Sequence, residues 1–327
     1  MPAAKKTWPA LCIAGAAGFG LASAQAATFE VDEQTRLTLG GEVVLNYIDT
    51  ETVGGESTTE FVDDGSLVIL GGERDLGNGI TAYVYNEFAY NTLGDDSDFQ
   101  RDMSVFGFKG DFGEIQIGDS DNVFEDLIAD TMDPFENATL AQADLSDETK
   151  MITYYSPSIG DFAYRLQARV QDDTDTGANT EASLIAAAQY AMTDTFSIHA
   201  GYDSRGSENA ADTGFESQDP VLGVAAVATF VDAVEVSARL AQEDNKDGND
   251  IDYIGGAIRF DYGGGSLYGA AQNVSPDIGD SASQVAVGVN YDIAPGLLVF
   301  AEYGDFAGYG EVTDNESLAV AGLILEY

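Results

Sequence analysis

The sequence predicts an all-β protein, a sixteen-stranded antiparallel transmembrane β-barrel. Three observations carry this prediction. Tight turns and long loops alternate along the chain, and apolar and polar residues alternate within the segments between them. After the first 26 residues, no stretch contains the roughly 18 apolar residues that a membrane helix needs. The 37 glycines and only 7 prolines among 327 residues suit a fold of strands and tight turns.

The first 26 residues have the three parts of a secretory signal peptide. Lys5 and Lys6 supply a positive start, and an apolar stretch and a cleavage site of small residues follow. We therefore expect residues 27–327 to form the exported, mature protein. A lipid anchor at Cys12 is a weaker alternative, because the apolar stretch before it is short. Cys12 is the only cysteine and leaves with the signal, so disulfides are not expected to hold the mature chain.

The turns and loops give the strand count. Seven short connections carry the Gly, Asn, Asp or Pro that tight hairpins need, and they lie at 77–79, 111–113, 158–160, 193–194, 232–233, 263–265 and 294–296. Eight long polar connections alternate with them, near 51–65, 91–101, 120–148, 173–181, 205–219, 244–250, 275–283 and 306–315. Together they join sixteen strands, and the alternation is typical of an outer-membrane barrel with its long loops outside.

The expected strands alternate with a period of two, as segments 162–171, 196–203 and 234–241 show most clearly. Successive side chains on a strand point to opposite faces, so one face is apolar and the other polar. A soluble β-sandwich shows the same alternation. Strands of roughly 9–11 residues, which match the membrane thickness when tilted, and Tyr and Phe recurring near strand ends, as at Tyr83 and Tyr85, favour the membrane barrel.

The charge excludes some classes of function. Asp and Glu number 57 against 13 Lys and Arg, a formal net charge of −44. Binding to nucleic acid is not expected, because it requires a basic face. The acidity predicts a pore that attracts cations. A solvated acidic surface, suited to a saline habitat, is an alternative that stays open beside it.

Three stretches in order resemble the general Gram-negative porin family, the sixteen-stranded trimeric porins of the outer membrane: Gly72–Tyr83, Phe106–Gly118 and Tyr154–Pro157. The resemblance covers essentially the whole mature chain. It implies passive diffusion without a cofactor, a homotrimer, and contact with outer-membrane lipid and lipopolysaccharide. The final strand ends in Tyr327, which is similar to the terminal aromatic that such barrels present to the barrel-assembly machinery. The family usually ends in Phe.

The resemblance also implies that the third long loop, residues 120–148, folds into the barrel as a constriction loop. There its carboxylates would face basic side chains on the wall. The acidic candidates are Asp119, Asp121, Glu125, Asp126 and Asp130, and the basic candidates are Arg36, Arg101, Arg165 and Arg169. Five further residues are candidates for the lumen, namely Glu42, Lys109, Lys150, Arg239 and Arg259. For Arg239 and Arg259, simple neutralisation of lumen carboxylates is an equal alternative.

We therefore expect a general diffusion porin that passes small hydrophilic solutes and prefers cations. A substrate-specific channel and a structural or adhesive barrel remain alternatives from other classes. A hydrolase built on His199 and Ser197 is the weakest, because one strand supplies no triad. No metal site is expected, although calcium bound loosely to the acidic loops stays open. The stretch 243–254 resembles a calcium loop but has Ile254 where the ligand Glu belongs.

Overall fold

The computed structural model describes residues 26–52, 55, 57–94, 99–170, 182–205, 220–231, 233–245, 248–310 and 315–327. The expected signal peptide, apart from its last residue, lies outside them. The strands are β1 (Ala27–Asp32), β2 (Thr35–Thr52), β3 (Ser57–Asp63), β4 (Leu67–Gly77), β5 (Ile80–Ala89), β6 (Gln100–Gly110), β7 (Gly113–Asp119), β8 (Met151–Tyr155), β9 (Phe162–Arg169), β10 (Ser183–Thr193), β11 (Phe196–Asp203), β12 (Val221–Phe230), β13 (Val234–Glu243), β14 (Ile251–Asp261), β15 (Ser266–Pro276), β16 (Ala282–Ala294), β17 (Leu297–Phe306) and β18 (Glu316–Glu326).

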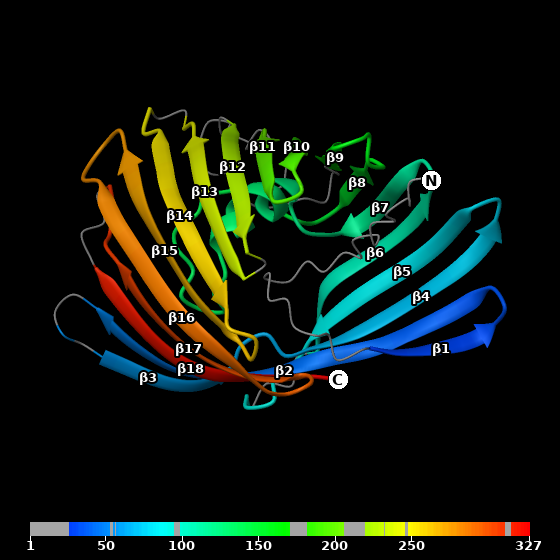
Figure 1. Ribbon diagram of the computed structural model, residues 1–327, viewed down its shortest axis with the longest axis horizontal. Coiled ribbons are helices and arrows are strands. Elements are labelled where there is room, and N and C mark those ends of the chain that lie inside the picture. The colour runs from blue at the N-terminus through cyan, green and yellow to red at the C-terminus, as the bar shows by residue number, and fades with distance from the viewer. Residues whose placement is uncertain are drawn as a thin grey trace, which may run out of the picture.

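All strand pairs are antiparallel, and β18 pairs back onto β2, so that the sheet closes into a barrel (Figure 1). The strands β3 and β4 pair with the two halves of β2 and form one strand interrupted at 64–66. The strand β1 pairs with β2 just beyond the end of β18 and continues its line. The barrel is therefore sixteen-stranded, as the sequence predicts. The loop expected at 51–65 is shorter than predicted, because residues 57–63 are already in β3.

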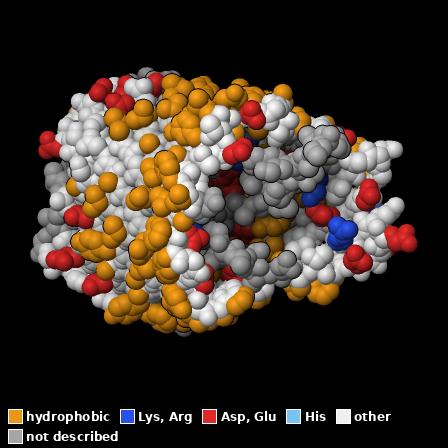
Figure 2. Space-filling model, in the orientation of Figure 1, with side chains coloured by type: hydrophobic (Ala, Val, Ile, Leu, Met, Phe, Trp, Pro, Cys, Tyr) orange, Lys and Arg blue, Asp and Glu red, His pale blue; other side chains and the backbone are white. Residues whose placement is uncertain are grey.

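The outer face of the barrel is apolar. On β16, the outward Val285, Val287 and Val289 are exposed, whereas the inward Ala286 is buried. Hydrophobic side chains accordingly form bands over the outer surface in Figure 2. Exposed apolar side chains in this number suit contact with lipid rather than water. No helix among the described residues is long and apolar enough to cross a membrane, a finding that has no bearing on crossing by strands.

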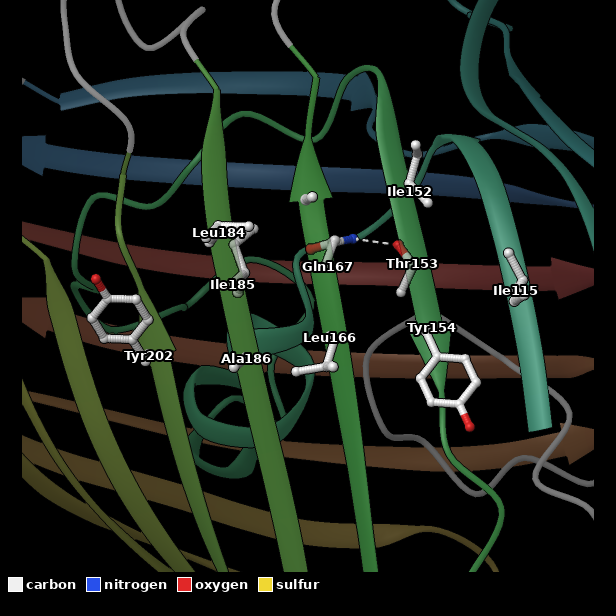
Figure 3. Close-up of a pocket in the computed structure, with 11 residues that line it drawn as sticks. Ile115, Ile152, Thr153, Tyr154, Leu166, Gln167, Leu184, Ile185, Ala186 and Tyr202 are labelled. Atoms are coloured by element: carbon white, nitrogen blue, oxygen red, sulfur yellow. Dashed lines mark hydrogen bonds between the residues drawn. The ribbon is translucent and has the colours of Figure 1, made fainter. Parts of the chain in front are cut away.

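A shallow depression of about 600 Å³ lies on this outer face over strands β7 to β11 (Figure 3). Large apolar side chains surround it, among them Ile115, Ile152, Leu166 and Leu184, and the small Ala186 lies between them. The aromatic residues are divided between the two faces. Tyr154 and Tyr202 border the depression outside, but Tyr83 and Tyr85, which the sequence suggested for an interfacial belt, donate hydrogen bonds to Glu114 and Glu87.

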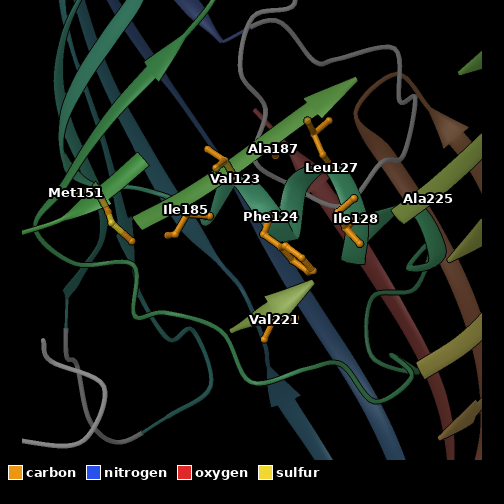
Figure 4. Packing of buried hydrophobic residues seen from close by; sticks show 9 residues of the cluster. All are labelled: Val123, Phe124, Leu127, Ile128, Met151, Ile185, Ala187, Val221 and Ala225. Carbon is orange, nitrogen blue, oxygen red and sulfur yellow. The ribbon is translucent and has the colours of Figure 1, made fainter. Parts of the chain in front are cut away.

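Residues 120–148 lie inside the barrel and begin with two helical turns, η1 (Glu125–Ala129) and η2 (Asp130–Met132). Phe124, Leu127 and Ile128 share one face of the turns and pack on β10, β11 and β12 (Figure 4). The wall makes room for them with glycine. A Cβ atom on Gly201 would lie 2.7 Å from the Phe124 ring, and one on Gly223 would lie 2.6 Å from Ile128.

Closure of the barrel depends on Gly41. Its N–H donates to the carbonyl of Tyr327 at 3.0 Å, and the N–H of Tyr327 donates back at 2.9 Å. The Tyr327 side chain lies over Gly41, and a Cβ atom there would collide with the carbonyl oxygen of Leu67 and lie 2.8 Å from the Tyr327 hydroxyl. The strand β2 therefore meets the end of the chain at Gly41, a position that has no space for a side chain.

We expect Gly41→Ala to lower the free energy of unfolding by about 1–3 kcal/mol, the usual cost of overpacking. A urea titration of the barrel refolded in detergent would measure the change. Gly264→Ala is the matched control, because a Cβ atom there approaches its nearest neighbour, Tyr291, only to 3.7 Å. Equal unfolding midpoints for the two variants would contradict the importance of this seam.

Candidate pore constriction

The inward loop fills one side of the lumen. Its first half packs on Ile185, Ala187, Val221 and Ala225, and Phe124 and Ile128 are at most 2% exposed there. Its second half brings Met132, Phe135, Ala138 and Leu140 against Tyr268, Ala270 and Ala286. Because these apolar clusters exclude water, any aqueous passage runs between the loop and the remaining wall. Figure 2 shows the hollow in one face of the molecule, with acidic side chains at its edge.

The tip of the loop is anchored by the carboxylate of Glu302 on β17. It accepts hydrogen bonds from three successive backbone N–H groups, those of Glu136, Asn137 and Ala138, at 2.8, 2.9 and 3.0 Å. The Tyr268 hydroxyl donates a fourth bond at 2.9 Å. A charged acceptor for several backbone donors is a strong and directional anchor. Alternation on β17 places Glu302 inward, but its partners come from a loop far away in the sequence.

The base of the loop is held by a second carboxylate, Asp203 at the end of β11. It accepts hydrogen bonds from the Asn122 side chain at 2.8 Å and from the N–H and hydroxyl of Ser146 at 2.8 and 2.6 Å. Arg205 is buried beside it with a left-handed backbone, φ 53°, and forms an ion pair with Glu243 at 2.8 Å. Neither Asp203, Arg205 nor Glu243 was among the residues that the sequence predicts for the site.

Three of the predicted basic residues lie beneath the loop rather than across from it. Arg165 forms an ion pair with Asp126 on η1. Arg169 is buried and donates to the Thr149 hydroxyl at 3.2 Å. Arg239 donates to the backbone carbonyls of Ala129 and Ala141, at 3.2 and 3.3 Å, and to Gln272 at 2.9 Å. These guanidinium groups therefore hold the loop on its own side of the barrel.

The remaining candidates are dispersed. Arg101 forms an ion pair with Asp119, which also accepts the backbone N–H of Lys150 at 3.1 Å. Both lie where the loop leaves the barrel wall. Lys109 forms an ion pair with Glu73 on β4. Arg259 donates to the Ser266 hydroxyl at 3.1 Å.

Arg36 was expected beside the loop, but the strand register places it elsewhere. It lies between Glu30 of β1 and Glu73 of β4, toward the periplasmic end of the barrel. Glu42, further along the same strand, lies within electrostatic reach of Glu136 at the tip of the loop. Alternation predicts the face on which a residue lies, because the side-chain period of a strand is two, but it contains no information on depth along the barrel.

The loop carries a dense group of carboxyls whose pKa values are displaced upward. Burial is the main cause, and the neighbouring carboxylates add to it, so that the pKa rises to about 7 for Asp121 and Glu148 and to about 8 for Asp130 and Glu136. Burial also raises the pKa of Asp126, although Arg165 opposes that shift. Mutual repulsion is expected where so many acids share one short segment.

The single histidine belongs to the support of the loop. The Nδ1 atom of His199 lies 2.9 Å from the carbonyl oxygen of Leu127, and its Nε2 atom lies 2.9 Å from the Ser197 hydroxyl. Donation from Nδ1 to the carbonyl leaves Nε2 to accept the serine proton. The neighbour of Nδ1 is thus a loop carbonyl rather than the carboxylate of a hydrolytic triad.

Among the described residues, no three His, Cys, Asp or Glu side chains gather in an arrangement that could hold a metal ion. Part of the calcium-like stretch, at 246–247, lies outside the described residues. Loose binding of calcium at the acidic loops therefore stays a prediction.

Residues 10–309 match the family model described as Gram-negative porin. A protein of Halomonas sp. named monosaccharide porin is 26% identical over 369 residues, which cover 97% of this chain and 98% of that protein. The major outer membrane protein of Halomonas elongata matches with the same identity and coverage. The major outer membrane protein P.IB of Neisseria lactamica is 24% identical, over 76% of this chain and 79% of its own.

Solved structures show the same fold. An anion-selective porin from Comamonas acidovorans superposes with a TM-score of 0.71 at 17% identity, over 90% of this chain and 100% of that one. A Vibrio cholerae outer membrane protein that lacks its loop L8 gives a TM-score of 0.69 at 19% identity, with the same coverage. At these identities the likeness concerns the fold and carries no information on selectivity.

We expect Glu302→Gln to loosen the tip of the loop. The amide keeps one acceptor oxygen and turns a donor toward backbone N–H groups, and each bond to a charged group contributes about 1.5–3 kcal/mol. The free energy of unfolding in detergent should fall by about 2 kcal/mol or more, and single-channel current should become noisier. Glu30→Gln, on β1 at the periplasmic end of the barrel and away from the loop, is the control. If the current through Glu302→Gln is no noisier than that of the wild type and its unfolding midpoint is unchanged, Glu302 does not anchor the loop.

We also expect stability to depend on pH through the loop acids. A carboxyl whose pKa is raised in the folded state binds its proton more readily there than in the unfolded chain, so its contribution favours folding at low pH and is lost as pH rises to about 8. Unfolding of the wild type between pH 5 and pH 8, compared with the double variant Asp130→Asn and Glu136→Gln, would measure this. The variant should lose less stability toward pH 8, and parallel curves would contradict the assignment.

Proposed function

Because the chain belongs to the Gram-negative porin family and is a protein of the outer membrane, we propose that it is a general diffusion porin that prefers cations. Small hydrophilic solutes and ions would pass through the barrel without binding chemistry or turnover. The observation that carries the proposal is the acidic loop inside a closed barrel. Carboxylates in a narrow, partly desolvated passage raise the local concentration of cations and repel anions.

The fold of the Comamonas neighbour, an anion-selective porin, does not weigh against this preference, because selectivity depends on the side chains around the passage. The described loop carries Asp121, Glu125, Asp126, Asp130 and Asp133, and Arg165 is paired with one of them. A net negative charge therefore remains at the constriction at neutral pH, even with some of these carboxyls protonated.

A second candidate is a substrate-specific channel. The Halomonas relative named monosaccharide porin favours it, since it matches this chain over nearly its full length. Tyr83, Tyr85 and Tyr155 are inward, and their hydroxyl groups offer hydrogen bonds to a sugar. Such a channel would show a conductance that sugar reduces in a saturable way, whereas a general porin would not.

We propose the same partners that the family has in general. Porins are generally trimers embedded in the outer membrane, and a homotrimer in contact with lipid and lipopolysaccharide is expected here. Tyr327 at the end of β18 would engage the barrel-assembly machinery. The apolar outer face supports embedding in a membrane, and the acidic composition supports the expectation that nucleic acid is no partner. We propose no enzymatic activity and no cofactor.

The proposal is tested by the reversal potential of single channels in a planar bilayer under a potassium chloride gradient. We expect a potential of the sign that cation permeation gives, and stepwise conductance in groups of three from a trimer. Replacing loop carboxylates in the double variant Glu125→Gln and Asp130→Asn should reduce the cation-to-anion permeability ratio by about tenfold. A folded barrel without conductance would contradict the channel and favour an adhesive role.

A further inference from the structure

The wall across from the loop carries carboxylates of its own. Glu42 on β2 and Glu87 on β5 are separated only by β4, where their register partners are Leu67 and Ile69. Glu42 and Glu87 are close enough for their charges to interact. The next strand, β6, carries Asp102. The register between β5 and β6 shifts at this point, next to Glu87. These three acids form an arc on strands β2, β5 and β6.

The wall arc meets the loop acids at one end through Asp121. Burial raises the pKa of Asp121 to about 7, and the charges that add to it, in decreasing order, are those of Asp126, Glu148, Glu87 and Asp102. Two of these neighbours belong to the loop and two belong to the wall. Asp121 therefore lies between the two arcs, within electrostatic reach of both.

The arcs meet again at the tip of the loop. Burial raises the pKa of Glu136 to about 8, with further contributions from Glu302, Glu42, Asp133 and Asp64 in that order. A direct bridge fixes this end, because the Asn137 side chain accepts a hydrogen bond from Asn46 of β2 at 2.9 Å and donates one to Asp64 at 2.6 Å. The tip is thereby tied to the same strand that carries Glu42.

The arginines nearest the loop have partners of their own. Arg259, which lines the same small cavity as Asp130 and Asp133, donates to the Ser266 hydroxyl. Arg165 and Arg239 are bound beneath the loop, on the side away from the wall arc. Arg101 is paired with Asp119 where the loop begins. Glu87 accepts a hydrogen bond from the Tyr85 hydroxyl, a group that carries no positive charge.

We propose that Glu42 and Glu87 are specificity-determining residues, because they complete a closed ring of carboxylates with the inward loop. An ion would then cross between like charges on all sides, instead of between an acidic row and a basic row. Such a ring concentrates cations at its centre and has little transverse field to orient a neutral dipolar solute. The inference rests on the proposed channel function and names the residues that set its selectivity.

The test is the double variant Glu42→Gln and Glu87→Gln, which removes two charges of the wall arc and leaves every loop residue unchanged. In a potassium chloride gradient, its cation-to-anion permeability ratio should fall by about tenfold relative to the wild type. Glu30→Gln is the matched control, since it removes one charge at the periplasmic end of the barrel, where Glu30 of β1 lies beside Arg36 and away from the ring. Its ratio should stay within about twofold of the wild type.

Each outcome decides one claim. A wild-type channel that conducts without preferring cations would overturn the proposed selectivity itself. A cation-selective wild type whose ratio survives both wall substitutions would overturn the ring and leave the loop as the sole determinant. If the double variant does not fold, as judged by the loss of heat-modifiable migration in gel electrophoresis, the single variant Glu87→Gln is measured instead. It should lower the ratio by about threefold, and an unchanged ratio would equally overturn the ring.

Discussion

The rest of the structure depends on the complete pairing of backbone groups around the barrel. Within a membrane, an unpaired N–H or C=O costs several kcal/mol, so a sheet that spans it must close on itself. Here the closure runs along β2 and β18, from the pair of Glu316 with Thr52 to the pair of Glu326 with Glu42. Once the barrel closes, the lumen has a fixed diameter. The long loop between β7 and β8 can then be held across it by side chains from distant strands.

The loop shows how the protein accommodates charge that would otherwise destabilise it. Acidic residues crowd onto a segment that is nevertheless buried, and their repulsion is offset by apolar packing on one side and by anchors on the other. Phe124 and Ile128 fit against Gly201 and Gly223, while Glu302 and Asp203 take up backbone and side-chain donors at the tip and base. In the proposed channel, the loop carboxylates can serve selectivity because wall residues hold the loop.

Much of the fold could be predicted from the sequence, because its signals are local. The turn at Gly77–Gly79 and the alternation in 234–241 each depend on neighbouring residues, and the structure has both as predicted. The site could be predicted only in part. Alternation indicates that Arg239 points inward, but whether it faces the passage or lies beneath the loop depends on where residues 120–148 pack. Glu302 gave no signal in the sequence, since its partners are distant in the chain.

The strand β1 continues the line of β18 along the edge of β2, so the first and last strands of the described chain meet at one seam. Contacts at this seam join strands near the beginning of the chain to the strand that is synthesised last. Such non-local pairing is slow to form, because loop closure must precede it. Until the final strand is in place, β2 presents an unpaired edge that is prone to pair with other chains. The barrel therefore needs protection from aggregation for as long as its last strand is missing.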